Sequence, residues 1–140
     1  MKQVPEHFYR QSAALPFRHD RGSLEILLIT SRRKKRWVIP KGVVELDLDP
    51  ATSAAREALE EAGIEGELSS RSIGSYQYEK WGGTCSVEVF SMAVETTYNA
   101  WPESYRDRHW LDPVEAADRV NEPALKKIIL AFADDFTSVS

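Results

Sequence analysis

Runs of apolar residues along the chain predict a set of β-strands. Residues 11–18 (QSAALPFR) and 24–31 (LEILLITS) are expected to form two strands joined by a turn at residues 20–22. The second run is apolar nearly throughout, which is typical of a central strand covered on both faces. Pro16 favours an edge position or a bulge for the first strand, because proline has no N–H to give to a neighbouring strand. Further strands are expected at residues 37–39, 72–81, 84–95 and 108–111.

Residues 49–63 predict a helix whose two ends are both encoded. Asp49 is a favourable N-cap, Pro50 suits the first helical position, and Gly63 suits a left-handed C-cap. Small apolar residues recur at helical spacing and form a stripe suited to close packing against a sheet. These residues are Ala51, Ala54, Ala55, Ala58, Leu59 and Ala62.

Two more helices are expected in the last third of the chain. Asp112 and Pro113 repeat the start signal for a helix that runs to about residue 120, and Asn121 and Pro123 open the last helix. The apolar stripe of that helix consists of Leu125, Ile128, Ile129 and Phe132. Strands first, one helix inside and helices last indicate an α+β layered domain built on a mixed sheet. With 140 residues and no internal repeat or linker, the chain is expected to form a single domain over residues 1–140.

The composition is that of an ordinary globular protein, with 42% hydrophobic and 29% charged residues. A formal net charge of −4 predicts no general attraction to nucleic acid or to an anionic membrane, so a polyanion site must be a local basic patch. No apolar run approaches membrane-spanning length and no signal peptide is recognisable, so a cytoplasmic location is expected. The one cysteine, Cys85, excludes an internal disulfide and is expected to be a small hydrophobe rather than a nucleophile.

Three carboxylates gather on the helix of residues 49–63. At about 100° per residue, Glu57, Glu60 and Glu61 fall within one arc of roughly 100° outside the alanine stripe. Like charges at positions i and i+4 disfavour a helix by about 0.2–0.5 kcal/mol. A divalent cation would reverse this repulsion, and Mg²⁺ or Mn²⁺ suits hard oxygen ligands at this density. The alternative is a solvated acidic face that binds nothing.

The spacing of Gly42, Arg56-Glu57, Glu60-Glu61 and Gly63-Ile64 resembles the Nudix box. This resemblance implies a family of metal-dependent hydrolases that cleave a diphosphate bond, and an α/β/α sandwich with a mixed β-sheet between helices. It also implies metal ligation by Glu57, Glu60 and Glu61. Glu57 is the favoured base for the attacking water, and the box arginine, Arg56, is counted with it among the catalytic candidates.

Two positions depart from the Nudix pattern. Leu48 stands where the family has a glutamate that helps to hold the box arginine, and Ala58 stands where the family usually has a larger aliphatic residue. Leu48 cannot pair with Arg56. Candidate replacements for the missing acid are Glu60, one turn along the helix, and Glu45 or Asp47 in the preceding loop.

Basic residues outside the box are candidates for phosphate binding. The run Arg32, Arg33, Lys34, Lys35 and Arg36 either is solvated or meets the outer phosphates of a highly charged substrate. Lys41 occupies a position at which Nudix enzymes commonly offer a backbone carbonyl to the metal, and its ammonium either contacts phosphate or points into solvent. Arg106 and Arg108 would share one face if residues 105–111 are extended. These two arginines either bind phosphate or are ordinary charges on an edge strand.

A likeness to one Nudix subgroup extends beyond the box. Trp37-Val38-Ile39-Pro40 before the box and Trp101-Pro102-Glu103 after it are similar to the diphosphoinositol polyphosphate phosphohydrolases, which also hydrolyse diadenosine polyphosphates. Arg106, Arg108, Trp110 and Leu111 continue the same likeness. Pro40-Lys41-Gly42 instead resembles diadenosine polyphosphate hydrolases, because the eukaryotic members of the first subgroup carry glycine in place of lysine.

The expected function is therefore Mg²⁺-dependent hydrolysis of a diadenosine polyphosphate or a diphosphoinositol polyphosphate, with Mn²⁺ as a possible substitute. A nucleoside triphosphate or nucleotide-sugar pyrophosphatase is an alternative, and so is a catalytically silent domain that senses a nucleotide, which Leu48 would suit. The expected partners are the small polyphosphate and, in a homodimer, a second copy of the chain. Glu88 is either a further ligand or base or a solvent-facing residue, and no role is expected for the histidines. Four aromatic residues either stack on a base or belong to the core or rim: Tyr76, Tyr78, Trp81 and Trp101.

Overall fold

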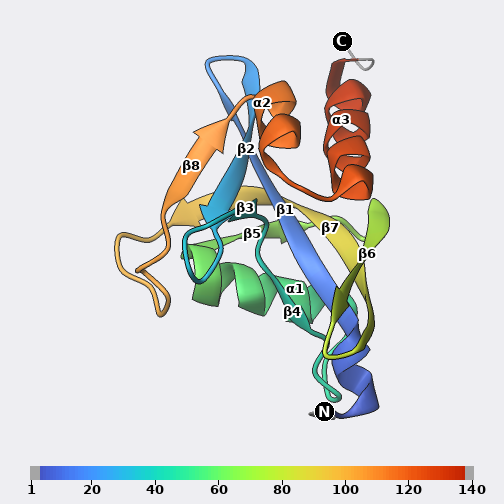
Figure 1. Ribbon diagram of the computed structural model, residues 1–140. Helices are drawn as coiled ribbons and strands as arrows, with labels where there is room; N and C mark the ends of the chain where they lie inside the picture. Colours follow the sequence, from blue (N-terminus) through green and yellow to red (C-terminus); the bar gives the residue numbers. More distant parts are fainter. Residues whose placement is uncertain (1–3, 138–140) are drawn as a thin grey trace.

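The computed structural model describes residues 4–137. Its elements are, in order, η1 (Glu6–Tyr9), β1 (Arg10–Asp20), β2 (Ser23–Thr30), β3 (Trp37–Val38), β4 (Lys41–Val43), α1 (Pro50–Glu57), η2 (Ala58–Ala62), β5 (Ile64–Leu68), β6 (Gly74–Lys80), β7 (Gly83–Thr97), β8 (Arg108–Leu111), α2 (Pro113–Arg119) and α3 (Pro123–Thr137). The sheet lies between α1 on one side and α2 and α3 on the other (Figure 1). No helix in the described part of the chain is long and apolar enough to cross a membrane.

The strands of residues 4–137 form one eight-stranded mixed sheet. The order along the sheet is β3-β2-β1-β7-β5, while β4 pairs with β1, β6 with β7, and β8 with β2. Strands β1 and β7 run parallel, and the other pairs are antiparallel. The predicted α/β/α sandwich with a mixed sheet is confirmed.

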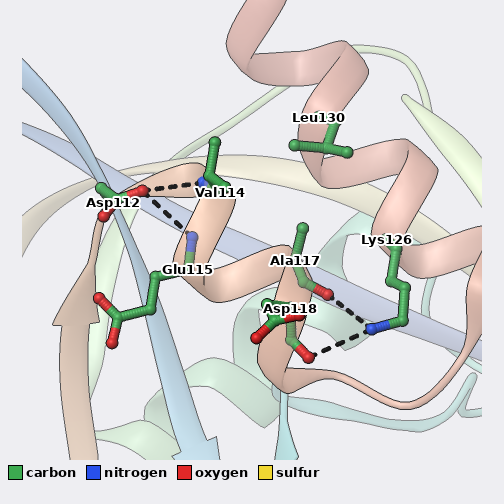
Figure 2. A pocket seen from close by; sticks show the side chains of 7 residues that line it. All are labelled: Asp112, Val114, Glu115, Ala117, Asp118, Lys126 and Leu130. Carbon is green, nitrogen blue, oxygen red and sulfur yellow. Dashed lines mark hydrogen bonds between the residues drawn. The ribbon is translucent and has the colours of Figure 1, made fainter.

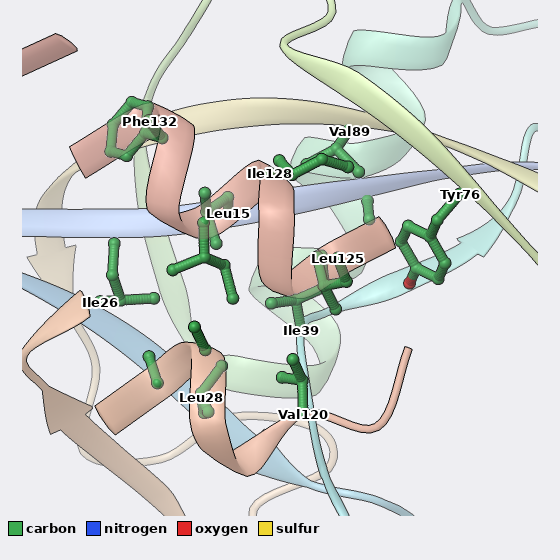
Figure 3. Close-up of a cluster of buried hydrophobic side chains, with 14 of the residues drawn as sticks. Leu15, Ile26, Leu28, Ile39, Tyr76, Val89, Val120, Leu125, Ile128 and Phe132 are labelled. Carbon is green, nitrogen blue, oxygen red and sulfur yellow. The ribbon is translucent and has the colours of Figure 1, made fainter. Parts of the chain in front are cut away.

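Both faces of the central strands are buried. Along β2, Ile26 and Leu28 point to the core beneath α2 and α3, while Leu27 and Ile29 point to the core beneath α1. This alternation explains why the sequence of β2 is apolar nearly throughout, and it confirms the prediction of a central strand. Figure 3 shows the first of these cores, in which the apolar face of α3 covers β1 and β2.

The second core is built from small side chains. Ala54, Ala58 and Ala62 are fully buried against Ala14 and Leu27 of the sheet. Small residues let the helix backbone approach the strands closely. The predicted stripe is confirmed for its five alanines, whereas Leu59 belongs to neither core. Ala58, the departure from the family pattern, is one of these contacts.

The prediction that Pro16 places β1 at an edge is wrong, because β1 pairs with β7 and β2 across its middle. The ladder with β4 ends at Ala13, and the ladder with β2 begins at Phe17. The N–H of Ala14 points to this same side, where it donates to the Pro40 carbonyl at 3.0 Å. Pro16, two residues further, faces the same side in the gap between the two ladders, so its missing N–H breaks no strand pairing.

The box helix begins as predicted but is not a uniform α-helix. Thr52 N–H donates to Asp49 Oδ1 at 2.7 Å, which confirms the N-cap. After Glu57 the chain forms a π-helical turn, η2, and it ends at Gly63 with a left-handed φ of 66°. Such turns widen a helix by one residue and are common at functional sites. The π turn leaves few signals in sequence, because the caps on either side are those of an α-helix.

Three elements were not expected from the sequence. Strands β4 and β5 are short and carry glycine and charged residues, so neither has a clear apolar alternation. The 3₁₀ turn η1 has no buried residue. The remaining predicted strands and the helices α2 and α3 lie at their expected places, and Asp112 Oδ1 caps α2 by accepting from Val114 and Glu115 N–H.

Gly63→Ala is expected to destabilise the fold more than Gly22→Ala does. Both glycines have positive φ, but a Cβ at Gly22 has no neighbour within 4 Å, whereas a Cβ at Gly63 would lie 2.7 Å from the Trp101 ring. Gly22→Ala therefore carries only the left-handed strain, about 1–2 kcal/mol, and Gly63→Ala should lose about 1–3 kcal/mol more through overpacking. Urea unfolding measures the difference. Equal losses of unfolding free energy in the two variants would show that the Trp101 ring can move aside without cost.

Candidate active site

The site is centred on a close approach between the box helix and β4. Glu57 is the last residue of α1, and a Cβ at Gly42 would lie 2.4 Å from its carboxyl carbon and from Oε1. No side chain other than hydrogen fits there without displacing the carboxylate. The box glycine therefore lets the Glu57 carboxylate lie directly against the backbone of β4.

Glu57 and Glu61 lie close enough for one carboxyl group, when protonated, to donate to the other. Burial, followed by the charge of Glu61 and this hydrogen bond, raises the pKa of Glu57 to about 8. Burial also raises the pKa of Glu61, while Arg106 and the hydrogen bonds from Glu57 and from the backbone N–H of Lys41 act against the rise. Without a metal, the pair therefore shares a proton at neutral pH.

Arg106 links this pair to the rest of the fold. Its side chain is 7% exposed, and its Nη2 lies 4.0 Å from Glu61 Oε2. Nη2 and Nε donate to Glu103 Oε1 at 2.8 and 3.0 Å, and Nη1 donates to the Thr30 carbonyl at 3.0 Å. Arg106 thus places one positive charge between two carboxylates and ties the loop of residues 98–107 to β2.

Arg108 serves the end of the box helix instead. Its Nη1 donates to the Ala62 carbonyl at 2.8 Å, and its guanidinium stacks 3.9 Å from the centre of the Trp101 ring. Trp101 Nε1 in turn donates to the Glu61 carbonyl at 3.0 Å. The condition for a shared face with Arg106 is not met, because β8 begins only at Arg108 and Arg106 lies in the preceding turn.

A polar cavity of about 300 Å³ opens beside Glu61. Five cationic side chains and one carboxylate contribute to its wall. The lining residues are Ser31, Arg32, Arg36, Val38, Ile39, Lys41, Glu61, Lys80 and Arg106. Such an excess of positive charge in a small hollow suits a ligand with several phosphates.

Only the two ends of the basic run reach this cavity. Ser31 Oγ accepts from the backbone N–H groups of Lys35 and Arg36, both at 3.2 Å, and this closes the run into a tight loop. Arg33 and Lys35 are exposed and do not line the cavity, and Lys34 instead lies 3.8 Å from Asp107. Of the predicted phosphate-binding residues, the structure brings together Arg32, Arg36, Lys41 and Arg106, and leaves Arg33, Lys34 and Arg108 outside.

Comparison with known proteins identifies the family to which this chain belongs. Residues 8–132 match the model of the NUDIX domain. The chain belongs to the Nudix hydrolase family. It is 34% identical to Nudix hydrolase 21, chloroplastic, of Arabidopsis thaliana over 89% of its length, and 31% identical to diphosphoinositol polyphosphate phosphohydrolase 3-beta of Bos taurus over 80%. It spans 66% and 69% of these two relatives.

Solved Nudix structures share the fold. The C. elegans Ap4A hydrolase, in a binary complex, superimposes with a TM-score of 0.71 at 21% identity, covering 92% of this chain and 98% of that one. The E. coli dihydroneopterin triphosphate pyrophosphohydrolase gives a TM-score of 0.68 at 17% identity, covering 91% and 96%. At these identities the likeness establishes the architecture and not the substrate.

The Nudix arginine and its loop differ from the expectation. Arg56 is exposed and, within residues 4–137, forms no ion pair with Glu45, Asp47 or Glu60. The loop is held to the helix by Ser53, whose buried hydroxyl accepts from the Glu45 N–H at 3.2 Å. A neutral hydrogen bond therefore helps to hold the loop against the helix, as an ion pair between an acid at position 48 and Arg56 would do.

The third box glutamate, Glu60, lies at the junction with the loop of residues 98–107. It is half-buried, and its carbonyl accepts from the Glu103 N–H at 3.0 Å. Glu103, which the sequence analysis named only within the Trp101-Pro102-Glu103 likeness and gave no role, contributes to the rise in the pKa of both Glu57 and Glu61. A long-range contact brings Glu103 next to the pair, so its effect on these two carboxylates could not be predicted from the local sequence.

The other candidates lie elsewhere. Glu88 borders a separate hollow at the start of α1 that includes neither Glu57 nor Glu61. Tyr76 is a core residue, and Trp81 packs against Phe8 and Tyr9. Cys85 is buried, as expected for a small hydrophobe. Lys80, which lines the cavity, was missed because only the pairing of β6 with β7 directs it there.

A further hollow of about 550 Å³ lies between α2 and α3, across the sheet from α1 (Figure 2). Lys126 crosses its floor to donate to the carbonyls of Ala117 and Asp118 at 3.0 and 3.2 Å. Val114 and Leu130 expose apolar surface above it. None of the predicted site residues contributes to this hollow.

The residues around Glu57 fit a divalent cation, although within residues 4–137 no preformed cluster of three or more His, Cys, Asp or Glu side chains is present. Glu57 and Glu61 provide hard oxygen donors whose shared proton a cation would replace. Ser12 pairs with Gly42 on β4, on the face where Ala14 packs against the helix. Its buried hydroxyl has no hydrogen-bond partner among the described residues, so a polar group on that face would satisfy it.

The stability of the metal-free protein is expected to fall as the pH rises from about 5 to about 8.5. Glu57 has a pKa of about 8 when folded, against an ordinary value of 4.5. Between these values the folded state keeps a proton that the unfolded state has lost, and this stabilisation disappears as the pH passes the folded pKa. Unfolding by urea in EDTA at a series of pH values measures the slope.

Glu57→Gln is the matched control for this slope. The neutral amide keeps the shape of the protonated acid and can still donate to Glu61, so its pH dependence should be shallower than that of the unaltered protein. An identical slope in the two proteins would contradict the assigned proton.

Proposed function

We propose that this Nudix domain hydrolyses a diphosphate bond in a small, highly phosphorylated substrate and requires Mg²⁺, with Mn²⁺ as a substitute. The observation that carries the proposal is that Glu61, the partner of Glu57, lies at the wall of a cavity with five cationic side chains. Carboxylates suit a metal, and the cations suit the phosphates that the metal does not neutralise.

Four groups of the chain would hold the metal: the carboxylates of Glu57, Glu60 and Glu61, and the backbone carbonyl of Lys41. When bound, Mg²⁺ would neutralise the diphosphate and lower the pKa of a coordinated water. Glu57 would accept the proton of the attacking water once a bound cation has displaced the proton that it shares with Glu61. Arg106 would keep Glu61 ionised and in place through its charge and its bonds to Glu103.

The cavity favours a diphosphoinositol polyphosphate over a diadenosine polyphosphate. Among the described residues that line it, none is aromatic, so no ring is available to stack on an adenine. Relatives named diphosphoinositol polyphosphate phosphohydrolase support the same choice, while the fold shared with an Ap4A hydrolase keeps the diadenosine compound as the comparison substrate. A higher kcat/KM for the inositol compound is expected.

Two further expectations remain predictions. A cytoplasmic location is proposed from the sequence alone, and relatives include chloroplastic and mitochondrial proteins. A homodimer is compatible with the exposed apolar residues Val114 and Leu130, and sedimentation at several concentrations tests it.

Glu57→Gln and Glu61→Gln are expected to lower kcat by at least about a hundredfold. Each substitution removes a metal ligand, and Glu57→Gln also removes the general base. Steady-state phosphate release with Mg²⁺ measures the effect, and circular dichroism verifies the fold. Near-normal turnover in both variants would refute the assignment.

The unaltered protein is itself the test of the rival function. Measurable Mg²⁺-dependent turnover, with at most a modest gain in Leu48→Glu, is expected, because Ser53 already holds the loop. Nucleotide binding without turnover, together with hydrolysis switched on by Leu48→Glu, would instead establish a sensor.

Arg32→Gln is expected to raise KM for the polyphosphorylated substrate about five- to tenfold, the scale of one partly exposed charge contact. Arg33→Gln removes the same charge from the same loop but from outside the cavity, so it should change KM little. Increasing salt should reduce the difference between the two variants. Equal effects of the two substitutions would mean that the loop acts only through its overall charge.

A further inference from the structure

The Lys41 ammonium is held by a chain of hydrogen bonds through Tyr78 and Gln11, two residues that do not line the cavity. Its Nζ donates to the Tyr78 hydroxyl at 2.9 Å and lies 4.3 Å from the centre of the Tyr78 ring. The Tyr78 hydroxyl donates to Gln11 Oε1 at 2.8 Å. Gln11 Nε2 donates to the Phe8 carbonyl at 3.4 Å, so the chain of hydrogen bonds ends on the backbone that precedes β1.

The direction of this chain is determined at each step. The Phe8 carbonyl can only accept, so the amide nitrogen of Gln11 faces it and the amide oxygen faces Tyr78. Tyr78 gives its single proton to that oxygen and therefore presents only lone pairs to Lys41. An ammonium group has three N–H donors. One is used on Tyr78, and Nζ makes no other hydrogen bond within residues 4–137.

The other two donors have only a more distant counter-charge, Glu61 of the same cavity, which lies beyond ion-pair range of the ammonium. Lys41 forms no ion pair within 4.0 Å among the described residues, and the cavity around it is lined by four other cations. A cation in this position is costly unless an anion joins it. The backbone N–H of Lys41 meanwhile donates to Glu61 Oε1 at 3.2 Å, so the ammonium belongs to the residue that also touches the carboxylate pair.

We propose that Tyr78 and Gln11 are positioning residues that aim the Lys41 ammonium at the substrate phosphate beside the carboxylate pair. This inference rests on the proposed function. The tyrosine hydroxyl fixes one N–H of the ammonium, its ring supports the charge, and the two remaining N–H groups point to phosphate oxygens. Tyr78 was a candidate for stacking on a base, and its role here is to hold a cation instead.

The test is a double-mutant cycle between Tyr78→Phe and Lys41→Met, read out by binding of methylenediphosphonate with Mg²⁺ in a calorimeter. Tyr78→Phe keeps the ring and removes only the hydroxyl. It should weaken binding about three- to tenfold in the unaltered protein, and have almost no effect in the Lys41→Met background. In turnover assays it should raise KM by the same factor and change kcat by less than about twofold.

Two controls separate positioning from general destabilisation. Tyr98→Phe removes another tyrosine hydroxyl, which donates to Glu65 at an exposed strand end, and should leave binding unchanged. Gln11→Leu leaves Tyr78 intact and should weaken binding in the same direction, which provides a second variant if Tyr78→Phe unfolds. An equal loss on Tyr78→Phe with and without Lys41, or a loss in kcat alone, would overturn the proposal.

Failure of this inference is distinguishable from failure of the proposed function. If the protein binds the diphosphonate but hydrolyses no diphosphate, the cycle still measures the coupling between Tyr78 and Lys41. If hydrolysis proceeds and the cycle shows no coupling, the proposed function stands and the positioning role is refuted.

Discussion

One unfavourable contact, the approach of the buried carboxylates of Glu57 and Glu61, organises the region around it. Burial and mutual repulsion raise both pKa values, and a shared proton holds the pair together when no metal is bound. Gly42 leaves the room for this approach, while the Lys41 N–H and Arg106 offset part of the charge on Glu61. Exchange of that proton for a divalent cation would convert a destabilising feature into a binding site.

The loop of residues 98–107 determines how the end of the box helix is completed. The loop supplies Trp101 and Arg106 on one side of the Glu57–Glu61 pair. Arg108 follows the loop and donates a hydrogen bond to the Ala62 carbonyl at the end of the helix. Gly63 is therefore both the C-cap of the helix and the residue against which the Trp101 ring of this loop packs. Stability and chemistry meet at the same few residues, which is common at sites where charges are buried.

Local signals accounted for the long strands and the helix ends, and they failed at the short elements β4, β5 and η1 and where contacts are remote. Asp49 and Gly63 could be read as helix ends because a cap depends on two or three neighbouring residues. The edge position predicted for β1 was wrong because the strand can accept Pro16 in the gap between its ladders with β4 and β2. No local pattern in the sequence marks this gap. The sequence left Arg108 open between phosphate binding and an ordinary edge-strand charge, because a guanidinium carries the same charge whether it faces a ligand or caps a helix.

The sequence by itself determined the box, since its glycine, glutamates and caps lie at fixed offsets within one segment. It also determined the two-faced burial of β2, from a run that is apolar nearly throughout. Only the tertiary structure decided which cations share the cavity. Arg32, Lys41 and Lys80 come from three separate segments, and their meeting depends on the pairing of strands distant in sequence. Charge and burial can be estimated residue by residue, but the distance between two charges is a property of the folded chain.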